Sequence, residues 1–225
     1  MMMKLVSLLA LTASASGLMV RDKAPDFKAQ AVVGDDFEEV SLSQYTEAGK
    51  WVVLFFYPFD FTFVCPTEIL TFSEKAPEFE AKGVQVLGAS ADSHHVHLAW
   101  TKTPQEDGGL GTAVNFPLVA DITKEISTDY GILTNDPTMG YHSAPLRATF
   151  IIDPSGTVRS ISVNDEQVGR NIDETMRLVE GFQYADSHEG EGCPANWKPG
   201  KDTIEANPKG SKTFFKAMAG KYDTL

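Results

Sequence analysis

The sequence predicts an α/β fold in which helices flank one mixed sheet, parallel in its first half and antiparallel in its second. A strand, a helix and a second strand follow one another between residues 51 and 90, and strands joined in this way pair in parallel. Two later strands are separated only by Pro154-Ser155-Gly156, which predicts an antiparallel hairpin. With 42% hydrophobic content, a chain of 225 residues can bury one ample core.

The chain begins with a hairpin, which is followed by the first core strand. Residues 23–30 and 38–42 flank Gly34-Asp35-Asp36, a turn signal, and predict a short hairpin that precedes the main fold. Trp51 to Tyr57 is an unbroken run of aromatic and aliphatic residues. Such a run predicts a buried strand, which ends at Pro58.

A helix is predicted from Pro66, because proline suits the first turn of a helix and Glu68 places a carboxylate where the helix dipole favours one. Pro77 lies inside this helix. An interior proline costs about 3 kcal/mol or more, so we expect a kink or break within Ser73 to Pro77. The second strand, Val84 to Ser90, follows.

The rest of the chain alternates helices with three further strands. The predicted helices are residues 93–102, 124–130, 171–184 and the amphipathic segment 211–219. The predicted strands are residues 116–120, 147–153 and 157–163.

Composition divides the chain into three parts. Residues 1–19 carry one charge, an apolar run and the small residues Ala13-Ser14-Ala15, the features of a signal peptide or another presequence. The apolar run is too short to span a bilayer, so no membrane anchor is predicted. Residues 20–184 form the predicted domain, and residues 185–225 form a polar C-terminal tail. We therefore expect the protein to enter the secretory route. The alternatives are a location in a plastid or another organelle, or in the cytoplasm.

The charge and the glycine pattern exclude several classes of partner. The chain has 19 basic and 31 acidic residues, a net charge of −12, which disfavours nucleic acid or an anionic membrane as a partner. Gly108 to Gly111 lacks the Gly-Lys-Ser/Thr of a phosphate loop, so no nucleotide site is predicted there.

The two cysteines are Cys65 and Cys193, too few for a disulfide scaffold. One structural intrachain disulfide in a secreted domain is the plain alternative. No Cys-x-x-Cys pair exists, because Glu68 stands where the second cysteine would be, and this disfavours a dithiol reductase.

Cys65 is predicted at the beginning of a helix, where backbone N–H groups and the helix dipole favour a thiolate. A thiol with a pKa near 8.5 is only about 3% ionised at pH 7, so a reactive cysteine needs such help. Arg147 is a candidate second cation, although an arginine at a strand end is more often a surface ion-pair residue. The Thr62 hydroxyl is a candidate contact for a small oxygen substrate, with a simple turn threonine as the alternative. This set of groups fits attack on a peroxide O–O bond, and Cys193 is then the available thiol to condense with the sulfenic acid formed.

Two segments carry a family resemblance. Pro58-x-x-x-Thr62-x-x-Cys65-Pro66-Thr67-Glu68 resembles the peroxidatic motif of typical two-cysteine peroxiredoxins, and Glu191 to Trp197 resembles their resolving-cysteine segment. The resemblance implies a thioredoxin-like fold and a thiol peroxidase acting on hydrogen peroxide and small alkyl hydroperoxides. It implies that Cys65 is the peroxidatic and Cys193 the resolving cysteine, that Pro58 shields the thiol, and that Thr62 and Arg147 bind the peroxide. It further implies an interchain disulfide in a homodimer, often a decamer of five dimers, a thioredoxin-like reductant, and no metal or organic cofactor.

The chain departs from the family pattern at two places. His95 and Val96 stand where Phe and Ser are usual, and the resulting His94-His95-x-His97 does not converge on a helix, so no metal site is predicted. Gly108 to Gly111 matches a loop linked in the family to over-oxidation, whereas Phe214-Phe215 replaces the accompanying Tyr-Phe pair. Sensitivity to over-oxidation is therefore not predicted from the sequence.

Three alternatives to the two-cysteine peroxidase stay open from the sequence. One is a one-cysteine mechanism in which Cys193 is incidental. Another is a ring-forming chaperone or signalling scaffold whose peroxidase activity is secondary. The last is a secreted binding module with one structural disulfide.

Overall fold

The computed structural model describes residues 17–219, so the predicted presequence lies almost entirely outside the described residues. The strands are β1 Lys28–Val33, β2 Asp36–Ser41, β3 Trp51–Phe56, β4 Val84–Ser90, β5 Leu118–Ala120, β6 Arg147–Ile152, β7 Val158–Asn164, β8 Glu191–Gly192 and β9 Ile204–Glu205. The helices are α1 Leu42–Thr46, α2 Cys65–Ala81, α3 His94–Lys102, α4 Glu125–Asp129, α5 Ile172–Ser187 and α6 Ser211–Met218, with one turn of 3-10 helix at Gln105–Asp107.

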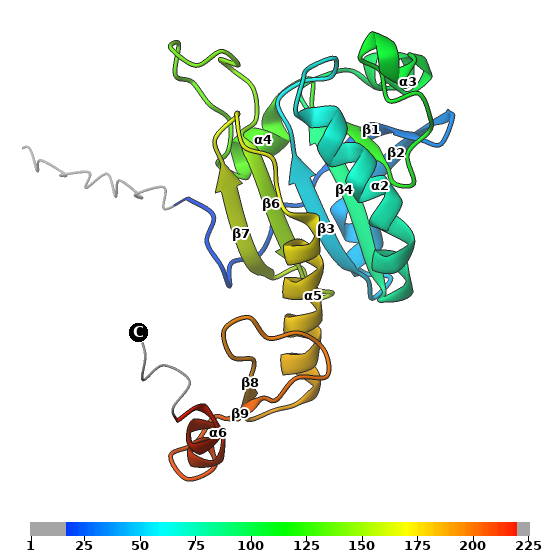
Figure 1. Ribbon diagram of the computed structural model, residues 1–225. Coiled ribbons are helices and arrows are strands. Elements are labelled where there is room, and N and C mark those ends of the chain that lie inside the picture. Colours follow the sequence, from blue (N-terminus) through cyan, green and yellow to red (C-terminus); the bar gives the residue numbers. More distant parts are fainter. Residues whose placement is uncertain (1–16, 220–225) are drawn as a thin grey trace, which may run out of the picture.

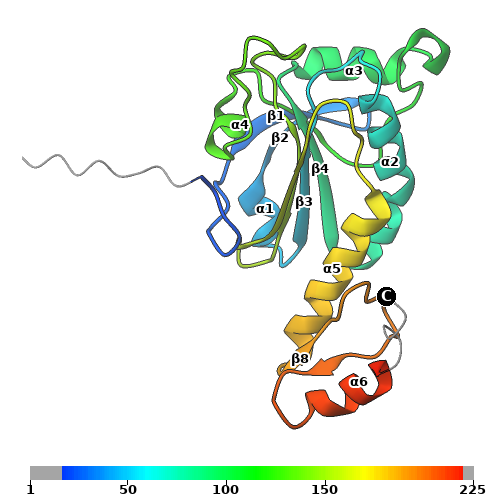
Figure 2. The same cartoon turned by 60° about the vertical axis from the view of Figure 1, so that its left-hand side comes forward.

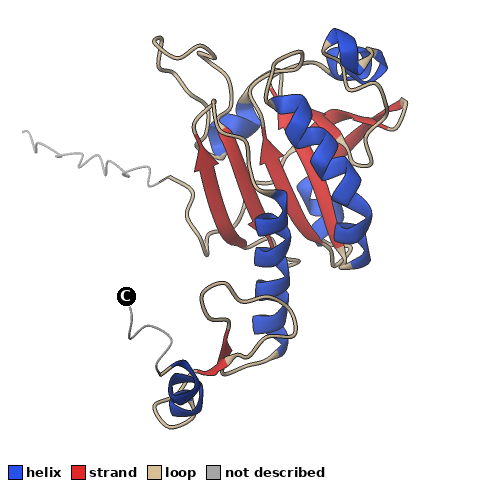
Figure 3. Ribbon diagram, viewed as in Figure 1, coloured by secondary structure: helices blue, strands red, loops and turns tan. Residues whose placement is uncertain are grey.

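Seven strands form one mixed sheet in the order β2-β1-β5-β4-β3-β6-β7. Strands β3, β4 and β5 pair in parallel, while β6 pairs antiparallel with β3 and β7 antiparallel with β6, as predicted. The N-terminal hairpin β1–β2 is not separate from this fold, because β1 pairs with β5 and extends the same sheet. Figure 3 shows the sheet in red between the helices in blue.

The sheet has a core on each face because successive side chains of a strand point to opposite faces. In β3, Val53 and Phe55 pack with α2, α5 and Trp100 of α3 on one face, whereas Val52 and Leu54 pack with α1 and α4 on the other. Figure 1 shows α2 and α5 in front of the sheet, and Figure 2 shows α1 and α4 on the opposite side of the sheet from them. Cys65 lies in the first of these cores.

The sequence predicts a kink or break within Ser73 to Pro77. Helix α2 runs unbroken through Pro77, so the break is wrong, and the kink stays a prediction. Proline has no N–H to donate to the carbonyl four residues earlier, which here belongs to Ser73. That carbonyl accepts a hydrogen bond from the Asn115 side chain at 3.0 Å, and the Ser73 hydroxyl accepts one from the Asn115 backbone at 3.0 Å. The neighbouring loop therefore satisfies the group that the proline leaves unpaired.

The C-terminal tail forms a small unit at the far end of α5, which extends past residue 184 to Ser187. Strands β8 and β9 pair there, and α6 contacts β9. Trp197 is 2% exposed and lies against Tyr184 of α5, with ring centroids 5.0 Å apart. Within residues 17–219 no helix is long and apolar enough to cross a membrane.

Candidate active site

Cys65 is the first residue of α2, and its side chain is fully buried. The central strand β3 ends at Phe56, and residues 57–64 connect its C-terminal end to the start of the helix. The sulfur therefore lies at the positive end of a helix of 17 residues, as the sequence predicted.

Arg147 contacts the sulfur of Cys65. It begins β6, the neighbour of β3, and its Nη1 lies 3.2 Å from Cys65 Sγ. Its side chain is only 1% exposed, which excludes the alternative of a surface ion-pair residue. Burial lowers the pKa of this guanidinium, but Cys65 and Glu68 beside it raise that pKa above its ordinary value. The arginine is therefore a permanent cation beside the thiol.

Glu68 lies behind this contact as a buried acceptor for two arginines. Arg147 Nη1 and Arg170 Nη2 each donate to Glu68 Oε2 at 2.8 Å, and Arg170 Nε and N each donate to Oε1 at 2.9 Å. Although burial raises the pKa of Glu68, the hydrogen bonds and charge of Arg170 and the charge of Arg147 bring it below its ordinary value. Glu68 is thus an ionised carboxylate that orients Arg147 toward the sulfur.

Arg170 also fixes the two strands that meet at the site. Its Nη1 donates to the carbonyls of Phe56, at the end of β3, and Ala148, near the start of β6, both at 2.8 Å. The sequence does not single out Arg170, and it marks Glu68 only as a carboxylate in the first turn of a helix. Nothing in the local sequence around Arg170 marks it, because its partners lie between 22 and 114 positions away.

Pro58 and Thr62 belong to the turn that precedes Cys65. Pro58 is buried and Thr62 is half-buried. The Thr62 hydroxyl donates to the Phe59 carbonyl at 2.8 Å, which leaves its oxygen lone pairs as acceptors. This bond is the one expected of a turn threonine, and contact of Thr62 with a substrate stays a prediction.

Cys193 lies on the far end of α5, in the small C-terminal unit. Its thiol is half-buried and faces the Gly181 carbonyl, with 3.7 Å between sulfur and oxygen. A cavity of about 340 Å³ adjoins it, lined mainly by apolar groups of α5 and the tail. Burial raises the pKa of the Cys193 thiol, although Arg177 opposes the shift. Cys193 is therefore a protonated thiol at neutral pH.

The two cysteines of one chain are both free and lie far apart. Helices α2 and α5 run side by side in the same direction, since Lys75 pairs with Asp173 at 3.6 Å and Gln183 Nε2 donates to the Lys82 carbonyl at 2.9 Å. At about 1.5 Å per residue, the helix separates Cys65 from Lys82 by roughly 25 Å. Figure 1 accordingly shows β8 and β9 beyond the end of α2 that is opposite its N-terminus.

The three histidines of α3 do not converge. His97 is fully buried and its Nδ1 lies 2.8 Å from Asp60 Oδ2, whereas His94 and His95 contact the ring of Phe37. Among residues 17–219 no three His, Cys, Asp or Glu side chains form a group that could hold a metal ion.

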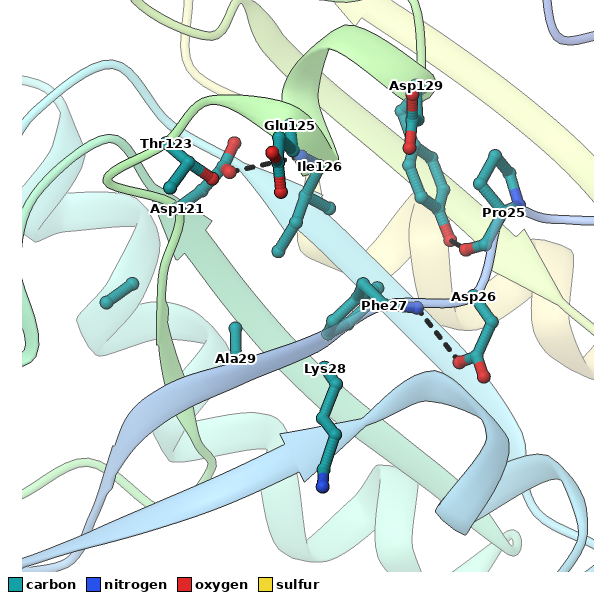
Figure 4. A pocket seen from close by; sticks show the side chains of 12 residues that line it. Pro25, Asp26, Phe27, Lys28, Ala29, Asp121, Thr123, Glu125, Ile126 and Asp129 are labelled. Atoms are coloured by element: carbon teal, nitrogen blue, oxygen red, sulfur yellow. Dashed lines mark hydrogen bonds between the residues drawn. The ribbon is translucent and has the colours of Figure 1, made fainter.

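A separate cavity of about 260 Å³ lies between α4 and the start of β1 (Figure 4). Asp121 in its wall accepts hydrogen bonds from the backbone of Ile126 and Ser127, so this carboxylate is occupied in capping α4. Tyr130 in the same wall donates to the Pro25 carbonyl at 2.9 Å. The cavity includes neither cysteine and is not part of the thiol site.

Comparison with known proteins agrees with this geometry. Residues 20–161 match the model of the AhpC/TSA family, and residues 181–217 match that of the C-terminal domain of 1-Cys peroxiredoxin. The chain belongs to the AhpC/TSA family. It is a peroxiredoxin, a thiol-dependent peroxidase with the predicted thioredoxin-like fold.

Relatives and solved structures extend over most of the chain. Peroxiredoxin-2 of Macaca fascicularis is 56% identical over 192 residues, 85% of this chain and 92% of the relative. The mitochondrial thioredoxin-dependent peroxide reductase of Bos taurus is 50% identical over 199 residues, 88% of this chain and 74% of that protein. The reduced 2-Cys peroxiredoxin of Plasmodium vivax superposes with a TM-score of 0.81 at 42% identity, covering 88% of this chain and 98% of that one.

Proposed function

We propose that Cys65 is the peroxidatic thiol of this peroxiredoxin, with hydrogen peroxide and small alkyl hydroperoxides as substrates. The observation that carries the assignment is the Arg147 guanidinium 3.2 Å from the sulfur of a helix N-terminal cysteine. Cation and helix dipole both favour the thiolate, which is the nucleophile. Cys193 does not begin a helix, and burial raises its pKa although Arg177 opposes the shift.

In the proposed reaction the Cys65 thiolate attacks one peroxide oxygen and the O–O bond breaks. A sulfur–oxygen bond forms, and the second oxygen leaves with the electron pair and takes up a proton as water or alcohol. Arg147 stabilises the negative charge that moves from sulfur to the leaving oxygen. Thr62 accepts a hydrogen bond from the peroxide, and buried Pro58 keeps bulk water from the thiolate.

Cys193 of a second subunit is the proposed resolving thiol. It condenses with the Cys65 sulfenic acid, forming a disulfide and releasing water. A disulfide needs its sulfur atoms about 2 Å apart. In one chain Cys193 lies beside Gly181, on the part of α5 that contacts Lys82, and α2 separates Lys82 from Cys65 by roughly 25 Å. This separation supports resolution between chains in a homodimer, which assembles further into a decamer as in the family.

The disulfide is returned to two thiols by a dithiol protein of the thioredoxin kind. The support is the name of the Bos taurus relative, a thioredoxin-dependent peroxide reductase. Residues 1–19 act as a targeting segment in this proposal, either a signal peptide or an organelle presequence, and the mitochondrial relative supports the second. Mass spectrometry of the mature N-terminus decides whether this segment is removed.

Two experiments test the assignment. Cys65→Ser is expected to abolish peroxide consumption, and turnover near that of the wild type overturns it. For the resolving step, Cys65→Ser subunits are mixed with Cys193→Ser subunits, unfolded and refolded together, and treated with peroxide. A covalent dimer on a non-reducing gel that appears only in the mixture supports resolution between chains. If the covalent dimer is absent both from the mixture and from the wild type, the one-cysteine mechanism is supported.

A further inference from the structure

A buried hydrogen-bonded cluster of Tyr57, Asp60 and His97 lies beneath the turn that leads to Cys65. The Tyr57 hydroxyl donates to Asp60 Oδ1 at 2.9 Å, and His97 Nδ1 lies 2.8 Å from Asp60 Oδ2. All three side chains are withdrawn from solvent. The cluster has no part in the reaction as proposed above.

The cluster is fully satisfied, which makes it rigid. Both ring nitrogens of His97 face oxygen atoms, since Nε2 lies 3.2 Å from the Val119 carbonyl on β5. Each ring nitrogen of His97 therefore has a hydrogen-bonding partner. Burial, and next the Asp60 carboxylate, raise the pKa of Tyr57 well above its ordinary value, so its hydroxyl stays a donor. Buried polar groups with every partner in place specify one geometry.

Asp60 is held through its backbone as well. Its N–H donates to Asp92 Oδ2 at 2.8 Å, and the Ser90 hydroxyl donates to the same oxygen at 2.8 Å. Residue 60 is thus bonded to His97 of α3, to Tyr57 directly after β3 and, through Asp92, to Ser90 at the end of β4. It is fixed at one point of an otherwise irregular turn.

The next residue carries backbone strain. Phe61 has φ +54°, a left-handed conformation that a bulky side chain rarely adopts. Such a conformation persists only where the surroundings determine it, and it is concentrated at functional sites. Thr62 follows directly, so the direction in which its hydroxyl points depends on how residues 60 and 61 are held.

We infer that Tyr57, Asp60 and His97 are positioning residues for the peroxide reaction, which hold the turn so that Thr62 faces the substrate of Cys65. The inference rests on the proposed function of Cys65 and Thr62. The cluster affects how the peroxide is bound and not how the thiol is placed, because α2 and Arg147 hold Cys65 separately. A displacement of Thr62 by about 1 Å is enough to lower the rate by one to two orders of magnitude.

The test compares two reactions of the same thiol. Tyr57→Phe removes one hydroxyl, and His97→Asn serves as a second variant should the first alter folding. We expect the rate constant for Cys65 oxidation by hydrogen peroxide to fall about tenfold in each. Alkylation of Cys65 by iodoacetamide, which does not need Thr62, is expected to change less than about twofold. Tyr130→Phe, which removes another buried tyrosine hydroxyl on the opposite face of the sheet, is the matched control and leaves both rates unchanged.

A double-mutant cycle with Thr62→Val separates positioning from general loosening. If the cluster acts through Thr62, Tyr57→Phe has little further effect on peroxide oxidation in the Thr62→Val background. The inference is overturned if the effects of Tyr57→Phe and Thr62→Val on the oxidation rate multiply. It is also overturned if the peroxide rate is unchanged in both cluster variants, or if alkylation of Cys65 slows in the same proportion as its oxidation. Failure of the proposed function is seen separately, as a Cys65→Ser variant that still consumes peroxide.

Discussion

Arg147 Nη1 lies 3.2 Å from the sulfur of Cys65, and the same nitrogen lies 2.8 Å from a carboxylate oxygen of Glu68. Its Nε donates to the Glu166 carbonyl at 2.5 Å, so the planar fork of the guanidinium is held on two sides. A lysine ammonium presents a point charge on a flexible stem and cannot make these contacts together. The orientation of the cation, and not its charge alone, is what the fold supplies.

Arg147→Lys is therefore expected to be a poor substitute. The rate constant for peroxide oxidation of Cys65 should fall about 100-fold, the usual cost of removing one preorganised donor from a developing charge. Stopped-flow measurement of the first oxidation step checks this. Arg159→Lys is the matched control, because Arg159 pairs with Asp153 and Asp186 away from the thiol. A rate within about twofold of wild type would falsify the role of Arg147.

Glu68→Gln is expected to weaken the fold and to change its acid sensitivity. Removing one member of a buried ion pair costs about 3–5 kcal/mol, and here two arginines lose their shared partner. Because the pKa of Glu68 is lowered in the folded protein, its contribution is complete above its ordinary value of 4.5 and is lost as pH falls through the folded value. The difference in unfolding free energy between wild type and variant should hence shrink below about pH 4.5. Urea unfolding at pH 7 and at acid pH measures it, and a constant difference contradicts the argument.

Much of the fold and part of the site follow from the sequence, for identifiable reasons. Trp51 to Tyr57 and the turn at Pro154-Ser155-Gly156 carry strong local signals, and both were confirmed. Cys65 at a helix start also follows from local signals, since Pro66 comes next. Arg170 was missed because its interactions with Glu68 and two strand carbonyls join segments distant in sequence, which no spacing rule reveals.

The unbroken helix at Pro77 was missed for the same reason and leads to a prediction. Asn115→Ala removes the donor to the Ser73 carbonyl and should destabilise the protein by about 1 kcal/mol. In a Pro77→Ala background the restored N–H of residue 77 bonds that carbonyl, so the same substitution should cost less. Urea unfolding of the four proteins gives the coupling. Equal costs in both backgrounds mean that Asn115 does not replace the missing hydrogen bond.

Trp197 is predicted to govern the second step of the reaction while leaving the first unchanged. Its ring packs against Tyr184 and its Nε1 donates to the Lys201 carbonyl at 3.1 Å, which closes the tail segment that holds Cys193 on α5. Trp197→Ala should leave oxidation of Cys65 unaltered and slow the interchain disulfide about tenfold, because a loosened segment presents Cys193 in the right geometry less often. Quenching the reaction at timed intervals with an alkylating agent, followed by non-reducing gels, measures this step. Trp197→Phe retains a ring and should recover most of the rate. Disulfide formation at the wild-type rate in Trp197→Ala shows that Cys193 needs no such support.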